Sequence, residues 1–588
     1  MSILNESLAQ NLAKPITDQK RQNKTPQSLP KDGISYLSGD TSDPLQFKTI
    51  PQMLRETVSR HGPRDAAVFP DQNRRLTYYD FDREIDALAT GLLALGLNKG
   101  DRVGIWSPNR YEWVLTQFAT ARIGLILVNI NPAYRLSELE YALNKVQCKA
   151  LVLAESFKNS HYLEMVKELA PELANCEPGQ LNASKLPSLK IVISMSDTAP
   201  SGMFGFQQVA KLGGPAQQLR LETITSTLNP DDAINIQFTS GTTGSPKGAT
   251  LSHYNIINNA RYVTDRINLT EMDSLCIPVP LYHCFGMVMG ALGCVSKGAT
   301  MVFPSQGFDP EETLHALASE RCTALYGVPT MFVAMLQKME NHQYDLTALR
   351  TGIMAGAPCP IDIMERVINE MNMTEVTICY GMTETSPVSF QSFVDDPVEK
   401  RCSTVGRIHP HVEVKIIDQE GAIVPVGTSG QLCTRGYSVM KGYWGDEERT
   451  NESIIDGWML TGDLAVIDSE GFCDIVGRVK DMIIRGGENI YPREIEDFLF
   501  RHPDISEAQV FGIPDEKFGE EVCAWLVAVP NKTVSEEAIR SFCEGQIAHY
   551  KIPKYIKVVK ELPMTITGKP QKFVMRDQMI SQLQHKSK

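Results

Sequence analysis

Helical and strand-like segments alternate along the first part of the chain, and this alternation limits the possible folds more than any other feature. Residues 77–95 carry apolar side chains at helical spacing, and Thr77 and Asp80 stand three apart as an N-cap pair. The alternation continues with a strand at 101–106, a helix at 111–123, a strand at 125–128, a helix opened by Ser137 and Glu140 as a capping box, and a strand at 150–153. The pattern predicts an α/β fold in which helices cover β-sheets.

The length of the chain and the changes in its residue pattern predict more than one domain. With 588 residues, the chain exceeds what one hydrophobic core usually organises. Two stretches rich in Pro, Gly and polar residues, 171–189 and 198–215, are expected to be loops. After residue 400 the β-like segments 412–417 and 430–434 predict a barrel-like or antiparallel region. We expect a mobile N-terminal arm (1–45), a large domain of helix-covered sheets with a β-barrel-like subregion (46–479) and a small, mobile α+β domain (480–588).

The composition excludes some classes of function. The chain is 42% hydrophobic and 22% charged, as in ordinary globular proteins, and its net charge of −13 argues against nucleic acid as the main partner. No apolar run approaches the roughly 20 residues that span a bilayer, and residues 1–33 lack the apolar core of a signal peptide. The 13 cysteines are scattered singly. We therefore expect reduced thiols, a cytoplasmic location and a monomer or homodimer.

A Gly- and hydroxyl-rich run follows the strand-like residues 233–237. Between residues 238 and 248 there are three glycines, five hydroxyl side chains and one lysine. Such a run can point backbone N–H groups and a positive charge at a polyphosphate, but it can also be a flexible loop. A Walker loop is excluded because Pro246 precedes Lys247 and Gly248 follows it, and no Gly-x-Gly-x-x-Gly run occurs. The candidate phosphate-binding residues are Thr239, Ser240, Gly241, Thr242, Thr243, Gly244, Ser245, Pro246 and Lys247.

Five further short clusters carry chemistry-bearing side chains. Each of them alone is more often structural than functional. Residues 380–385 place a hydroxyl beside a carboxylate after an apolar segment, and residues 460–463 place Asp463 at what we expect to be a tight turn. The others are 477–481, 485–489 and the Gly-Lys turn at 565–569.

In this order, the clusters resemble those of the adenylate-forming superfamily, which includes acyl-CoA synthetases, luciferases and peptide-synthetase adenylation domains. The resemblance covers roughly residues 50–580. The runs 235–253 and 481–492 are most similar to fatty acyl-CoA synthetases, in particular the medium-chain type of animal mitochondria and its bacterial counterparts. This resemblance implies an enzyme that uses ATP, Mg²⁺ and coenzyme A.

The chemistry of such an enzyme explains why these residue types are needed. A carboxylate is a poor acylating agent, and transfer of AMP to it creates a mixed anhydride that a thiol can attack. Because a carboxylate must approach a triphosphate, like charges have to be offset by lysine, Mg²⁺ and backbone N–H groups. The residues from Thr239 to Lys247 would, by resemblance, hold the β- and γ-phosphates. Lys569 would bridge the acyl carboxylate and the α-phosphate.

The resemblance also implies roles for residues in the other clusters. Glu384 would help to hold Mg²⁺, with Thr383 near the α-phosphate, and Asp463 would accept both ribose hydroxyls. Arg478, Tyr380, Gly381, Gly356 and Ala357 would contact the nucleotide, the last two along the adenine face. Lys480 would lie at a hinge, about which the small domain turns after adenylation and brings in Gly486, Gly487 and Glu488 for thioester formation.

Two positions leave alternatives open. His283 either lies at the carboxylate entrance, with residues 285–287 toward an acyl tunnel, or is a hydrogen-bonded core histidine. The segment 326–330 flanks the acyl pocket or is only a strand-to-helix turn. Pro570 departs from the family, where a larger aliphatic residue usually follows the lysine, and its effect on Lys569 stays open.

The leading hypothesis is an ATP-dependent fatty acid–CoA ligase for medium- to long-chain acids. Rivals of the same class are an aryl or branched-acid CoA ligase and a loader of carrier proteins. A catalytically silent nucleotide- or acyl-binding protein is disfavoured because Lys247, Glu384, Asp463, Arg478 and Lys569 are all present. A P-loop phosphotransferase fails on the missing Walker pattern.

Overall fold

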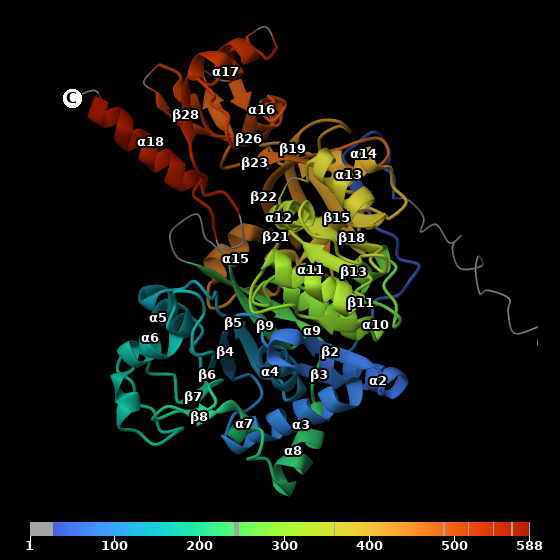
Figure 1. The fold of residues 1–588 in the computed structure, drawn as a ribbon, viewed down its shortest axis with the longest axis vertical. Coiled ribbons are helices and arrows are strands. Elements are labelled where there is room, and N and C mark those ends of the chain that lie inside the picture. Colours follow the sequence, from blue (N-terminus) through green and yellow to red (C-terminus); the bar gives the residue numbers. More distant parts are fainter. Residues whose placement is uncertain are drawn as a thin grey trace, which may run out of the picture.

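The computed structural model describes residues 28–239, 246–357, 359–485, 488–515, 517–544, 546–565 and 569–586. The chain forms a large domain, which contains three sheets, and a small C-terminal domain with a sheet of its own (Figure 1). This arrangement confirms the predicted α/β fold class. No helix in the described ranges is long and apolar enough to cross a membrane.

An eight-stranded sheet contains the N-terminal strands of the predicted alternation. Four neighbouring strands of this sheet, at 126–129, 102–106, 150–153 and 191–194, are parallel and buried on both faces, which explains their continuous apolar sequences. In spatial order its strands are β20 (Gly442–Tyr443), β10 (Lys247–Ser252), β9 (Ala233–Thr239), β5 (Ile126–Asn129), β4 (Arg102–Trp106), β6 (Ala150–Leu153), β7 (Ile191–Ser194) and β8 (Phe204–Gly205).

A nine-stranded sheet forms the second layer of the large domain. It is parallel in its centre and antiparallel at both edges. In spatial order its strands are β17 (Arg407–Ile408), β16 (Val388–Gln391), β15 (Glu375–Gly381), β14 (Thr351–Ala355), β13 (Ala324–Gly327), β11 (Ser274–Cys276), β12 (Thr300–Val302), β2 (Asp65–Phe69) and β3 (Arg74–Thr77).

The predicted barrel-like region is a curled antiparallel half-barrel. Its strands are β1 (Tyr36–Ser38), β18 (Val412–Ile417), β19 (Gly430–Gly436), β22 (Trp458–Ile467), β21 (Ile454–Ile455) and β23 (Cys473–Arg478), which pairs with β22. Because β1 pairs with β18, this part of the segment predicted as a mobile arm belongs to the half-barrel, whereas residues 1–27 lie outside the described ranges.

The small domain is an α+β unit. Its sheet contains β25 (Glu488–Ile490), β24 (Ile483–Arg485), β27 (Gly519–Ala528), β26 (Ile505–Asp515) and β28 (Tyr555–Val559). Its helices are α16 (Pro492–Leu499), α17 (Glu536–Cys543) and α18 (Lys572–Lys586). The half-barrel ends at Arg478 and the small sheet begins at Ile483, so Lys480 lies in the connection between them.

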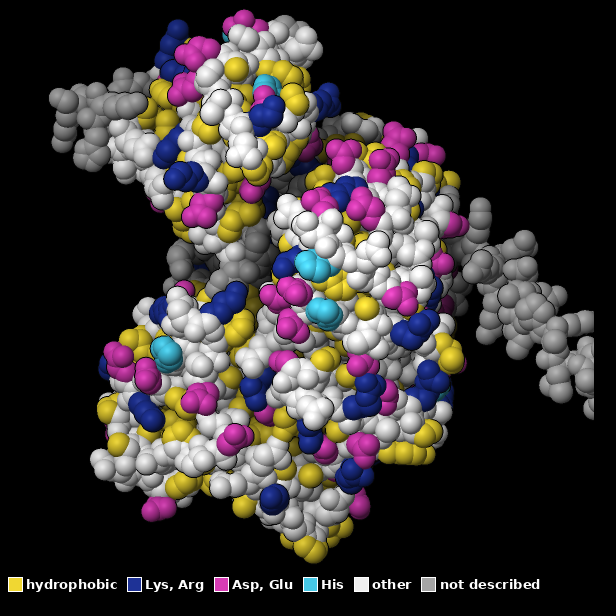
Figure 2. Space-filling view, in the orientation of Figure 1, with side chains coloured by type: hydrophobic (Ala, Val, Ile, Leu, Met, Phe, Trp, Pro, Cys, Tyr) yellow, Lys and Arg dark blue, Asp and Glu magenta, His cyan; other side chains and the backbone are white. Residues whose placement is uncertain are grey.

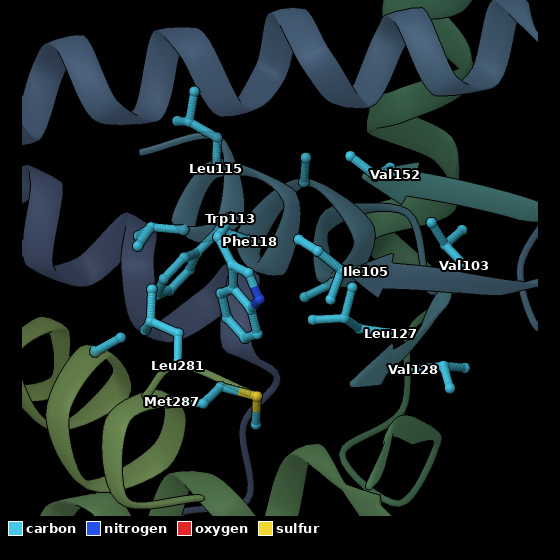
Figure 3. Packing of buried hydrophobic residues seen from close by; sticks show 14 of the residues in the cluster. Val103, Ile105, Trp113, Leu115, Phe118, Leu127, Val128, Val152, Leu281 and Met287 are labelled. Carbon is cyan, nitrogen blue, oxygen red and sulfur yellow. The ribbon is translucent and has the colours of Figure 1, made fainter. Parts of the chain in front are cut away.

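The helices of the large domain cover and separate its sheets. They are α2 (Ile50–His61), α3 (Tyr78–Ala94), α4 (Tyr111–Arg122), α5 (Leu136–Lys145), α6 (Tyr162–Leu169), α7 (Phe206–Val209), α8 (Pro215–Ser226), α9 (His253–Arg266), α10 (Gly293–Lys297), α11 (Pro310–Ser319), α12 (Pro329–Met339), α13 (Ile361–Glu370), α14 (Val398–Ser403) and α15 (Glu447–Ser453). Figure 3 shows Trp113 and Phe118 of α4 packed between strand residues such as Ile105 and Leu127 and the side chain of Met287. Met287 belongs to a fully buried π-helix, Phe285–Leu292.

Among the local features predicted from the sequence, three differ from the observed structure. The N-cap pair is confirmed, because Thr77 Oγ1 accepts the Asp80 N–H at 3.1 Å. The capping box at Ser137 is wrong: α5 begins at Leu136, and Glu138 accepts the Arg135 N–H at 2.9 Å. The loop predicted at 198–215 contains β8 and α7, since the aromatic residues Phe204 and Phe206 pack into the core. The third difference concerns Asp463 and is described below.

Candidate active site

The Gly- and hydroxyl-rich run connects the two strands of a β-hairpin. Strands β9 and β10 are antiparallel, and Thr239 pairs with Lys247 across them. Residues 240–245 lie outside the described ranges. A strand follows the run where a Walker loop would be followed by a helix, in agreement with the rejected P-loop. Beside the run, the Tyr141 hydroxyl of α5 donates to the Pro246 carbonyl at 3.1 Å.

Glu384 is buried beside this hairpin. It lies in a short 3₁₀ turn, Thr383–Thr385, that directly follows β15. Its Oε1 accepts hydrogen bonds from the Thr239 hydroxyl at 3.1 Å and the Tyr443 hydroxyl at 2.9 Å. The Lys247 ammonium in turn donates to the Tyr443 hydroxyl at 2.8 Å. The lysine predicted at the phosphates and the carboxylate predicted at Mg²⁺ are thus joined through one phenol.

The surroundings of Lys247 lower the pKa of its ammonium group. Burial is the main cause of its lowered pKa, and the positive charges of Lys480 and Arg449 act in the same direction. Glu384 opposes them. Asp446 acts in the same direction as Glu384, so two cations and two carboxylates influence this lysine.

Asp463 occupies a bulge in β22, which corrects the predicted tight turn. The strand stays paired with β19 on either side, but residues 461–463 lie opposite the single residue Leu432, and Gly462 adopts a φ of +74°. The bulge turns the Asp463 carboxylate toward two donors: the Tyr380 hydroxyl reaches Oδ2 at 2.5 Å, and Arg478 Nε reaches Oδ1 at 3.0 Å. Burial, and then Asp463, raise the pKa of Tyr380.

The small domain brings Lys569 to these residues. Among the charges that act on Lys569 are Arg478, Asp463 and Glu384. This residue is exposed at the surface, but the protein around it lowers its pKa, and the charge of Arg478 acts in the same direction. Its loop is closed by two hydrogen bonds with Thr565, and Pro570 forms a β-bridge with Met564. Figure 2 shows the surface hollowed where the small and large domains meet.

His283 lies between the charged cluster and an apolar region. It is half-buried, and its Nδ1 accepts the Phe285 N–H at 3.3 Å. Burial, with a further contribution from the charge of Lys569, lowers its pKa to about 4, so the ring is neutral at pH 7. Next to it the Phe285 ring stacks on Tyr326, with centroids 5.3 Å apart. Tyr326 lies in β13, directly before α12, as the strand-to-helix interpretation predicted.

The remaining predicted residues divide into two groups. Gly356 and Ala357 follow β14, and Tyr380 and Gly381 end the neighbouring parallel strand β15, so both pairs lie at one edge of the sheet. Arg485 lies in the small sheet instead, where it forms a bidentate pair with Glu521 at 2.7 and 3.0 Å. Glu488 follows in β25, and Pro358, Gly486, Gly487 and Gly568 lie outside the described ranges.

The sequence analysis missed Tyr443. Its only signal is an aromatic residue inside the Gly-flanked run 441–445, which resembles many β-turn sequences. Only the pairing of β20 with β10 brings its hydroxyl between Lys247 and Glu384.

Known proteins share both parts of this chain. The family model of AMP-binding enzymes matches residues 54–444, and that of the AMP-binding enzyme C-terminal domain matches residues 494–569. "Medium-chain acyl-CoA ligase ACSF2, mitochondrial" of Danio rerio is 48% identical over 562 residues, which are 95% of this chain and 93% of that protein. "Putative acyl-CoA synthetase YngI" of Bacillus subtilis is 47% identical over 541 residues, 91% of this chain and 98% of that protein.

The fold is also shared with solved structures. The structure of ATP-bound MatB from Rhodopseudomonas palustris superposes with a TM-score of 0.78 at 29% identity and covers 90% of this chain and 98% of MatB. Together with the two family models, this confirms the resemblance that the sequence predicted. The chain therefore belongs to the family of AMP-binding enzymes and contains both the main domain and the C-terminal domain of that family.

Proposed function

We propose that this protein is an ATP- and CoA-dependent fatty acid ligase that forms an acyl-adenylate and then an acyl-CoA thioester, with medium-chain acids as its substrates. The acyl-CoA ligases among its relatives support the class of reaction, and the name of the Danio rerio relative supports the chain length. The observation that carries the proposal is the hydrogen-bonded arrangement of Lys247 with Glu384, and of Asp463 with Arg478, together with the charges of these residues that act on Lys569 of the small domain.

In the first half-reaction, an oxygen of the acid attacks the α-phosphorus of ATP. The bond from that phosphorus to the bridging oxygen breaks, and pyrophosphate leaves with both electrons. Lys569 bridges the acid and the α-phosphate, while Lys247 and the hairpin loop hold the departing phosphates. At an effective dielectric constant near 20, one charge at 4 Å contributes about 4 kcal/mol, so correctly placed ammonium groups can offset the repulsion between the two anions.

Asp463 and its two donors bind the nucleotide. Its carboxylate accepts both ribose hydroxyls, and Arg478 and Tyr380 hold it in the orientation that this requires. Gly356 and Ala357 lie at the same sheet edge as Tyr380, and the adenine ring lies against their backbone and the small Ala357 side chain.

The residues present suit a magnesium ion carried by ATP. Magnesium in such sites is bound by one or two carboxylates and by substrate phosphates, not by a dedicated protein cage. Glu384 is a buried carboxylate whose two described hydrogen bonds both end on Oε1, and no group of three or more His, Cys, Asp and Glu gathers among the described residues. We infer that Glu384 holds this ion, which would neutralise charge on the phosphates.

In the second half-reaction, the small domain turns about Lys480. Lys569 leaves, and the hairpin that contains Arg485 and Glu488 enters in its place. The thiol sulfur of CoA attacks the acyl carbon, the bond to AMP breaks, and the thiol proton is released. The position of Lys480 between the half-barrel and the small sheet supports this assignment, as does the engagement of Arg485 with Glu521 inside the small domain. The entrance position of His283 is supported by its partly exposed ring, on which the charge of Lys569 acts.

Pyrophosphate release tests the proposal. The protein is supplied with ATP, Mg²⁺ and a panel of acids of different chain length, branched and aryl acids included, with and without CoA. Release is expected with acids of about six to twelve carbons, and thioester only when CoA is added. The absence of release with every acid at millimolar concentration would exclude the ligase, and a preference for aryl acids would exclude the fatty-acid assignment.

The oligomeric state and the cellular location of the protein are a separate part of the proposal. We infer a monomer or homodimer in the cytoplasm, although the name of the Danio rerio relative places that protein in mitochondria. Light scattering after gel filtration gives the oligomeric state, and cell fractionation gives the location.

A further inference from the structure

Tyr443 is fixed by its backbone on both sides. Strand β20 pairs with β10, so that Tyr443 lies opposite Ala249. The Tyr443 N–H donates to Thr450 Oγ1 at 2.9 Å, and the next residue, Trp444, donates its N–H to the Gly248 carbonyl at 2.8 Å. The side chain is 5% exposed. The phenol therefore has one position relative to the hairpin that carries Lys247.

The phenol lies between opposite charges. Its oxygen accepts a hydrogen bond from Lys247 Nζ at 2.8 Å and donates one to Glu384 Oε1 at 2.9 Å. An ammonium group can only donate and a carboxylate can only accept, whereas a phenol does both. Lys247 Nζ also lies 4.2 Å from the centroid of the Tyr443 ring, so the ring and the hydroxyl both hold the lysine.

Without the hydroxyl, the two charges would be free to pair directly. A direct, partly buried ion pair would neutralise both groups: the carboxylate would lose its capacity for Mg²⁺, and the ammonium its capacity for phosphate. The Thr239 hydroxyl, which also donates to Oε1, contacts only the carboxylate side and does not separate the pair.

We propose that Tyr443 is a positioning residue that separates Lys247 from Glu384 and so keeps the lysine available to the phosphates and the carboxylate available to Mg²⁺. This inference rests on the proposed function, since it assigns a task within the same site.

The first test uses the protein without ligands. In Tyr443→Phe the ring remains and only the hydroxyl is lost, so the fold should survive, which the thermal midpoint checks. The rate of acetylation of Lys247 by acetic anhydride is followed against pH by mass spectrometry. Direct contact with Glu384 should raise the pH midpoint of labelling by about one unit, whereas an unchanged or lower midpoint would overturn the proposal.

Two control variants test whether a shift in the labelling midpoint of Lys247 is specific to the Tyr443 hydroxyl. Tyr437→Phe removes a different buried phenol, which accepts from Asn259 Nδ2 at 3.3 Å, and should leave the labelling midpoint of Lys247 unchanged. Thr239→Val removes the other donor to Glu384 but keeps Tyr443, and should also leave that midpoint unchanged. An equal shift in all three variants would mean that the site had only loosened, and would overturn the separation by Tyr443.

The second test measures Mg²⁺ dependence. In pyrophosphate release, Tyr443→Phe should need about tenfold more Mg²⁺ for half-maximal rate, and the additional change Lys247→Gln should bring that requirement back toward the wild-type value because Glu384 is freed. An unchanged Mg²⁺ requirement in Tyr443→Phe would contradict the inference. If the wild-type protein released no pyrophosphate, the proposed function would fail, whereas the labelling experiment would still decide the task of Tyr443.

Discussion

Asp463 and Arg478 lie opposite each other on the neighbouring strands β22 and β23, and the guanidinium Nε donates to the carboxylate at 3.0 Å. Tyr380 reaches the other carboxylate oxygen from the nine-stranded sheet. The carboxylate is therefore held by two sheets at once, and its orientation is fixed before any ligand binds. A preorganised acceptor of this kind loses little entropy when it binds a nucleotide.

Replacing this carboxylate should weaken ATP binding specifically. In Asp463→Asn one charged acceptor becomes an amide, and hydrogen bonds to charged groups contribute about 1.5–3 kcal/mol, so the KM for ATP should rise roughly 10- to 150-fold. Steady-state pyrophosphate release measures the KM. Asp468→Asn, which removes a surface partner of Lys400, is the matched control and should leave the KM unchanged. Equal KM values in both variants would exclude Asp463 as the ribose acceptor.

The glycine before Asp463 should matter through its backbone. Gly462 has a φ of +74° and free space around the position of a Cβ, and Gly427 combines a φ of +80° with the same space. Gly462→Ala and Gly427→Ala should therefore each destabilise the protein by about 1–2 kcal/mol, because alanine disfavours the left-handed conformation. Only Gly462→Ala should raise the KM for ATP, since only that bulge orients Asp463. A rise of equal size in Gly427→Ala would refute this.

The two half-reactions should separate at Lys569. In Lys569→Ala adenylation should fall at least 100-fold, because the proposed bridge between the acid and the α-phosphate is lost, while thioester formation from supplied acyl-AMP should stay within about threefold. Stopped-flow assays of each half-reaction measure both. Lys560→Ala, at an exposed lysine of the same domain, should change neither rate. If both half-reactions of Lys569→Ala fell together, the alternation of the small domain would be wrong.

Acid should destabilise the large domain through His253. Burial lowers the pKa of this histidine from 6.5 to about 3, and its Nδ1 accepts the Ile50 N–H at 3.1 Å. Because the unfolded chain binds a proton below pH 6.5 that the folded protein excludes, stability that is present above pH 6.5 is lost as the pH falls toward 3.

From pH 7 to pH 5 this histidine should cost about 2 kcal/mol of unfolding free energy. In His253→Gln the amide oxygen can still accept the Ile50 N–H, but the titration is absent, so the loss between the two pH values should be about 2 kcal/mol smaller. Urea denaturation at both pH values measures the difference. His409, which is also buried with a strongly lowered pKa, is intact in both proteins. If the wild-type protein and His253→Gln lost the same unfolding free energy between pH 7 and pH 5, His253 would not be the cause of the acid destabilisation.

The sequence by itself determined the fold class, the family and most of the candidate residues. Helical and strand periodicities are local properties, and a hydrophobic segment such as 150–153 forms a buried strand in almost any α/β context. The Gly- and hydroxyl-rich run and the carboxylates at 384 and 463 are likewise continuous motifs. They could be recognised because their chemistry depends on neighbours in the sequence.

Only the tertiary structure decided how these motifs meet. Asp463 lies in a bulge and not in a turn, because whether a glycine with positive φ ends a strand or interrupts it depends on the strands on either side. Tyr443 carries no motif, and its position between Lys247 and Glu384 follows from strand pairing across almost 200 residues. The approach of Lys569 depends on the packing of one domain against the other. Such contacts arise from the geometry of the whole chain, so no local pattern in the sequence encodes them.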